Sequence, residues 1–133
     1  MSVQIGTGIS TEPDSFQAGT VAARAAAAGL GGDGADLALV FASGSHLAAP
    51  ETTLEGVQAV LAPRTLVGCG AGGVLALGHE HERGTAVAVW AAALGGGSAV
   101  PFHATAAGPE PDCEVAGLPS LAGSSGVLML SDP

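Results

Sequence analysis

The chain has 133 residues, the length of one domain with a single hydrophobic core. Three basic residues stand against twelve acidic ones, so the net charge at pH 7 is −9. This charge argues against binding to nucleic acids or to anionic membranes, because clusters of basic side chains bind phosphate groups.

The first predicted elements are a short strand and an alanine-rich helix. Residues 3–7 form a strand or a loose end of the chain. The helix begins near Thr11 or Glu12, because Pro13 suits the first helical position. The helix ends at Gly29, since glycine is favoured just after the last helical residue.

The centre of the sequence predicts a strand, a helix and a second strand. Leu37–Ala42 is a continuous apolar run, typical of a strand covered on both faces. The next segment places three apolar residues on one helical face: Leu54, Val57 and Leu61. Pro63 ends this helix, Thr65–Gly68 is the second strand, and Cys69–Gly73 is the turn that leaves it. Parallel strands joined by a helix end at the same edge of a sheet, where open α/β sheets bind ligands.

The pattern after this βαβ unit is less regular. Residues 74–77 form a short strand or one helical turn, and residues 78–84 form a polar connection. Thr85–Leu94 is apolar on both alternating faces, which predicts a well-covered strand. Gly95–Ser98 predicts a hairpin turn, from which Ala99–Ala106 returns as a further strand.

The last part of the chain predicts a surface loop at Gly108–Ser125 and a short strand at Val127–Leu130. A strand so close to the terminus indicates that residues 1–133 are a single domain cut short at its carboxyl-terminal end. The elements together predict an α/β fold: a mixed β-sheet with a βαβ unit, followed by a β-hairpin and flanking helices, as an incomplete α/β sandwich. Because an unpaired sheet edge invites pairing with another copy, we also expect a homo-oligomer.

Small and polar residues follow both strands of the βαβ unit, and we expect them to form a ligand-binding site. They are Ser43, Gly44, Ser45 and His46 at the first strand, and Gly68, Cys69 and Gly70 at the second. Backbone amides at these positions would hold an anionic or polar group, and an apolar wall would take the rest of the ligand.

Other kinds of chemistry have weaker support in the pattern. Ser43 and Cys69 are candidate nucleophiles, but no partner for a catalytic triad can be named. Gly68–Gly73 matches Gly-x-Gly-x-x-Gly, yet a helix precedes it and no long helix follows, unlike a dinucleotide site. His79 and His81 supply two ligands, whereas a firm metal site needs three or four. We therefore expect no catalytic residue, no metal and no cofactor.

The amino terminus indicates a cytoplasmic protein. Residues 1–4 lack the basic and apolar regions of an export signal, and no apolar run approaches the roughly 20 residues of a membrane span. Reduced thiols are therefore expected at Cys69 and Cys113.

The order of short motifs resembles one known family. The motifs are F-x-S-G at residues 41–44, L-V-G-C-x-x-G-G-V at 66–74, A-V-A-V-W-A-A-x-L at 86–94, P-F-H at 101–103 and L-x-L-S-D-P at 128–133. This arrangement resembles the amino-terminal part of the FIST domain. The resemblance implies an intracellular sensory module that binds a small molecule, such as an amino acid or a related metabolite. It also implies coupling to a signalling output domain or a partner chain.

Three hypotheses follow for the function. The first is a non-enzymatic sensor that binds a small ligand at the two strand ends. The second is a thiol or serine hydrolase that uses Cys69 or Ser43. The third is a haem-binding nitric oxide sensor, as the resemblance implies for some relatives, with one axial histidine out of four: His46, His79, His81 or His103.

Overall fold

A computed structural model describes residues 2–131 of the chain. The chain divides into two compact units, Met1–Ala99 and Val100–Pro133. Residues 132 and 133, which end the last motif of the sequence, lie outside the described residues.

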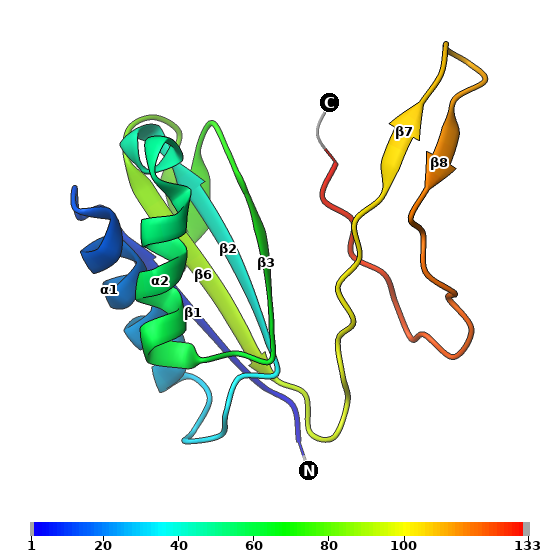
Figure 1. The fold of residues 1–133 in the computed structure, drawn as a ribbon. Helices are drawn as coiled ribbons and strands as arrows, with labels where there is room; N and C mark the ends of the chain where they lie inside the picture. Colours follow the sequence, from blue (N-terminus) through cyan, green and yellow to red (C-terminus); the bar gives the residue numbers. More distant parts are fainter. Residues whose placement is uncertain (1, 132–133) are drawn as a thin grey trace. The chain divides into compact units, whose positions relative to one another are not determined.

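The first unit is built on a four-stranded mixed sheet (Figure 1). Its strands are β1 (Gln4–Ser10), β2 (Leu37–Ser43), β3 (Thr65–Gly70) and β6 (Ala86–Ala93), in the order β1-β6-β2-β3. Strand β6 is antiparallel to both β1 and β2, whereas β2 and β3 are parallel. The predicted α/β fold with a βαβ unit is therefore confirmed.

Two α-helices, α1 (Ser15–Ala28) and α2 (Pro50–Leu61), pack together on one face of this sheet (Figure 1). Helix α1 begins later than predicted because the Asp14 side chain is its cap, accepting a hydrogen bond from Gln17 N at 2.8 Å. Pro13 therefore precedes the helix and does not occupy its first turn. A short 3₁₀ helix, η1 (Gly44–Ala48), connects β2 to α2. Among the described residues, no helix has the length and apolar character needed to cross a bilayer.

The core between helices and sheet consists mainly of alanine and valine. Such small side chains let the backbones approach closely. A β-carbon on Gly6 would clash with the Ala26 carbonyl of α1, and one on Gly19 would clash with the Thr53 carbonyl of α2. Glycine is therefore required where α1 meets β1 and where α1 meets α2.

Within the first unit, a short hairpin covers part of the other face of the sheet. The hairpin of β4 (Val74–Ala76) and β5 (His79–His81) lies against it, with Val74 buried beside Ala86 and Ala88. In the second unit, β7 (Thr105–Ala107) pairs with β8 (Glu114–Ala116).

Three predictions after β6 are wrong. Residues 99–104 form no strand, and the strand that follows, β7, pairs with β8 and not with β6. Strand β6 already has β1 and β2 on its two edges, so a returning hairpin strand has no free edge to join. The segment 108–125 contains β8 and is not wholly a loop, and Val127–Leu130 has no regular secondary structure.

Asp36 connects three strands at the edge of the sheet where β2 and β3 begin and β6 ends. Its N–H donates to Ala92 O at 2.8 Å, and its carbonyl accepts from Thr65 N at 3.0 Å. Its carboxylate accepts from Leu94 N at 2.7 Å and pairs with Arg64 Nε at 3.4 Å. The main chain and the side chain of Asp36 together thus connect the start of β2 to the end of β6 and to the start of β3.

We expect Asp36→Ala to lower the free energy of unfolding by about 2 kcal/mol, because the Leu94 N–H loses a charged acceptor. Arg64→Ala should cost about 0.5 kcal/mol or less, since the Arg64 side chain is 83% exposed and water screens the ion pair. Urea unfolding of both variants measures the difference. Equal losses would show that the ion pair, and not the bond to Leu94, carries the effect.

Candidate ligand site

The two predicted halves of the site lie at the ends of adjacent parallel strands. In the β2–β3 ladder, Phe41 is the partner of Cys69 and Ala42 is the partner of Gly70. Ser43 is the next residue along β2. The ladder is continued by a hydrogen bond from Ala71 N to Ala42 O of 2.8 Å.

The second half differs from its prediction in one respect. Cys69 and Gly70 belong to strand β3 and do not form a turn after it, whereas Gly68 lies in this strand as predicted. Strand β3 has only β2 as a neighbour, so its other edge is unpaired within the described residues. All three residues are exposed.

Ser43 is fully buried, and its hydroxyl is already engaged. It donates to Gly84 O at 2.9 Å, with Ala86 O at 3.5 Å as a second acceptor. The side chain therefore ties the end of β2 to the segment that enters β6. A hydroxyl held in this way is a structural contact and not an accessible nucleophile.

Gly44 and Ser45 are exposed and lie beside Thr85. The Ser45 N–H donates to Thr85 Oγ1 at 3.1 Å, and the two hydroxyl oxygens are also 3.1 Å apart. Gly44 has a φ of 63°, and a β-carbon there would lie 2.6 Å from Thr85 Oγ1. This close approach leaves a pair of exposed hydroxyls at the end of β2.

His46 is fully buried, unlike Ser45 before it. Its Nδ1 lies 2.9 Å from Ser15 Oγ at the start of α1, and its Nε2 has no hydrogen-bond partner among the described residues. The buried imidazole thus connects η1 to the start of α1 and is not exposed at the ends of the strands.

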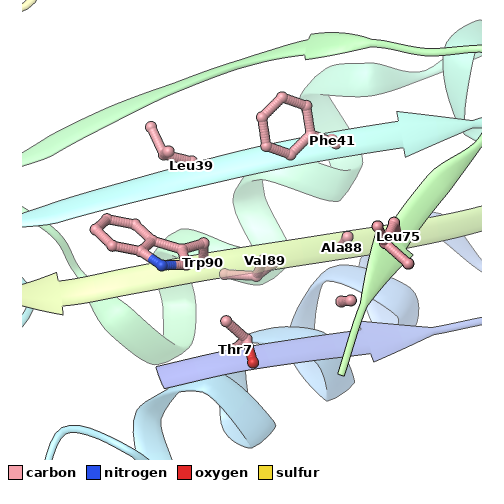
Figure 2. Close-up of a pocket in the computed structure, with 8 residues that line it drawn as sticks. Thr7, Leu39, Phe41, Leu75, Ala88, Val89 and Trp90 are labelled. Carbon is pink, nitrogen blue, oxygen red and sulfur yellow. The ribbon is translucent and has the colours of Figure 1, made fainter. Parts of the chain in front are cut away.

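An apolar hollow of about 260 Å³ lies on the sheet face opposite the helices (Figure 2). Residues of β1, β2, β4 and β6 line it: Thr7, Leu39, Phe41, Leu75, Ala76, Ala88, Val89 and Trp90. Phe41 connects the hollow to the strand ends, because Phe41 is the ladder partner of Cys69. This hollow is not among the features predicted from the sequence; the single tryptophan within the alanine–valine strand β6 was the available signal for it.

The family of the chain follows from comparison with known proteins. A family model described as the FIST N domain matches residues 36–133. The chain belongs to the FIST N family. Domains of this family are, in general, sensory domains of signal transduction.

Two relatives of this FIST N chain come from mycobacteria. It is 42% identical over 101 residues to "Uncharacterized protein Rv0628c" of Mycobacterium tuberculosis, a match that covers 76% of this chain and 26% of the relative. It is 38% identical over 90 residues to "Uncharacterized protein Mb0898c" of Mycobacterium bovis, covering 68% and 23%. The chain thus spans about a quarter of the length of these relatives.

The histidines of this FIST N chain do not fit a haem site. No imidazole is among the residues that line the hollow, and His46 is buried where Ser15 already occupies one nitrogen. His79 and His103 are exposed, and His81 lies on a three-residue strand. Within residues 2–131, no three His, Cys, Asp or Glu side chains gather as metal ligands would. Cys69 and Cys113 are both free thiols.

Proposed function

We propose that this FIST N chain is a non-enzymatic sensory domain that binds an amino acid or a related metabolite at the ends of β2 and β3. The observation that carries the proposal is the parallel pairing of these strands, which places Cys69 and Gly70 across from Phe41 and Ala42. The carboxyl ends of strands are the usual ligand-binding edge of open α/β sheets.

Five of the seven proposed residues would contact the ligand. The Ser45 hydroxyl and the Cys69 thiol are exposed polar groups, and Gly44, Gly68 and Gly70 are exposed residues whose main chain would contact the ligand. Ser43 and His46 would act as positioning residues, because their buried side chains hold η1 against Gly84 and Ser15. The engagement of the Ser43 hydroxyl also supports a binding role over hydrolysis.

The signal would pass to another part of the protein or to a partner chain. The mycobacterial relatives are about four times as long as the matched segment, which leaves room for an output domain in proteins of this kind. A cytoplasmic location would give such a domain access to intracellular amino acids and metabolites.

Calorimetric titration with the twenty amino acids and their common derivatives tests this proposal. We expect one saturable ligand, whose Kd rises roughly fivefold in Ser45→Ala and in Cys69→Ala, the loss of about 1 kcal/mol of hydrogen bonding. Ser98→Ala, at an exposed position in the turn after β6, is the matched control and should bind as the wild type does. Absence of any saturable ligand for the folded chain would contradict the proposal.

A further inference from the structure

The hollow on the open sheet face is formed by three strands in register. Thr7 of β1 and Leu39 of β2 are both ladder partners of Trp90 on β6. Figure 2 shows these three side chains side by side across the sheet. In the next row, the small Ala88 is the partner of Phe41, so the hollow deepens between the two aromatic rings.

The β4–β5 hairpin provides one wall of this hollow through Leu75 and Ala76. Val74, only 4% exposed, anchors the hairpin to Ala86 and Ala88, whereas Leu75 is 68% exposed. An apolar side chain so exposed at the mouth of an apolar hollow would lose contact with water once a ligand entered.

None of the residues that line the hollow carries a charge. A carboxylate or ammonium group inside would exchange part of its hydration for contact with apolar side chains and would gain no charged partner, at a cost in free energy. Two polar groups are nevertheless available: no side-chain hydrogen bond of the described residues involves the Trp90 indole N–H or the Thr7 hydroxyl. In Figure 2 the indole nitrogen lies on the edge of the ring that faces β1, where Thr7 is located.

We propose that this hollow is a binding pocket for an uncharged small molecule with an apolar body and one carbonyl or hydroxyl group. The apolar body would lie against Trp90, Phe41 and Leu39, under Leu75. The polar group would accept a hydrogen bond from Trp90 Nε1 or from Thr7 Oγ1. The volume of about 260 Å³ lies below the roughly 300–1,000 Å³ typical of drug-sized ligands, which favours a small metabolite.

This inference rests on the proposed small-molecule sensing and assigns the hollow a ligand class of its own, separate from the amino acid proposed for the strand ends. The lining explains why a free amino acid would not enter the hollow, since its ammonium and carboxylate groups would find no charged partner there.

Nuclear magnetic resonance of the single tryptophan tests the pocket directly. Trp90 is the only tryptophan, so its indole N–H gives one resonance without further assignment. The probes are 4-methylpentan-1-ol and 4-methylpentanoate, which share an apolar skeleton and differ in charge. We expect the alcohol to shift the indole resonance saturably, and the carboxylate to bind at least tenfold more weakly, as the desolvation of an unpaired charge requires.

Two variants localise the binding without disturbing the core. Leu75→Ala removes the exposed wall, and Thr7→Val keeps the shape of the side chain but removes its hydroxyl; each should weaken binding of the alcohol roughly fivefold. Val21→Ala, an exposed apolar truncation on α1, is the control and should leave the affinity unchanged.

Several outcomes would overturn the inference. These are an unmoved indole resonance, equal binding of the carboxylate, or no effect of Leu75→Ala. A shift that depends on protein concentration alone would show instead that a second copy covers this face. Amide shifts at Gly68–Gly70 with amino acids, but none at Trp90 with the alcohol, would refute the pocket and leave the proposed function standing. If neither the Gly68–Gly70 amides nor the Trp90 indole shifted, both proposals would be refuted.

Discussion

Replacing Gly6 by alanine should lower the free energy of unfolding of the first unit by about 3 kcal/mol, at the upper end of the usual cost of overpacking. The added methyl group would clash with the backbone carbonyl of Ala26 and would lie 3.2 Å from the Cα of Gly29. Both obstacles are main-chain atoms, so no side chain can turn aside to make room. Helix α1 would have to move away from β1 and would lose contact with the sheet.

Thermal and urea unfolding followed by circular dichroism measure this loss, and a decrease in Tm of about 12 °C or more is expected for a unit of this size. Gly34→Ala is the matched control. A β-carbon there meets no atom within 4 Å, and the residue lies in an exposed turn. The control should be neutral or slightly stabilising, because alanine reduces the entropy of the unfolded chain. Similar effects of the two substitutions would contradict the close approach of α1 and β1.

The second large effect is expected at His46, where alanine should cost about 3 kcal/mol. The substitution empties the space of a fully buried ring and leaves Ser15 without its partner. His46→Leu should cost about 1 kcal/mol or less, because it keeps most of the volume and removes an Nε2 that has no hydrogen-bond partner. Ser15 is partly exposed, so water can replace the lost bond.

Comparing the two variants separates a structural role of His46 from a direct role in binding. We expect the ligand affinity of the folded His46→Leu protein to remain within about threefold of the wild type, because the imidazole is not exposed at the strand ends. Complete loss of binding in a stable His46→Leu protein would show that the imidazole contacts the ligand. A His46→Ala protein as stable as the wild type would contradict the burial of the ring.

The sequence predicted the centre of the fold because the burial pattern there is local. Leu37–Ala42 and Thr85–Leu94 are continuous apolar runs, and both became strands with a neighbour on each edge. Which strands pair with one another cannot be predicted from such local patterns, because neighbours in the sheet can be distant in the sequence. The turn at Gly95–Ser98 suggested a hairpin, but whether a strand can return depends on which edges other strands have already taken. Here β1, from the far end of the sequence, had taken the edge of β6.

The candidate site was also predicted only in part. The βαβ pattern predicted that the two strand ends are adjacent, but it did not predict which side chains are buried and which are exposed. Ser43 and Ser45 are alike in sequence, yet one hydroxyl is buried against Gly84 and the other is exposed beside Thr85. The apolar hollow was beyond prediction because Thr7, Leu39 and Trp90 are brought together only by the pairing of three strands.

The family match begins at residue 36, but the fold of the first unit begins earlier. Strand β1 and helix α1 both precede that residue, and together they supply one border of the sheet and half of the helical layer above it. In a protein that contained only the matched residues, β6 would lack β1 as its neighbour on one edge. Val57 of α2 would lose its packing against α1. A fragment whose start is set by the family match would therefore be unstable. The first 35 residues are needed for the first unit to fold.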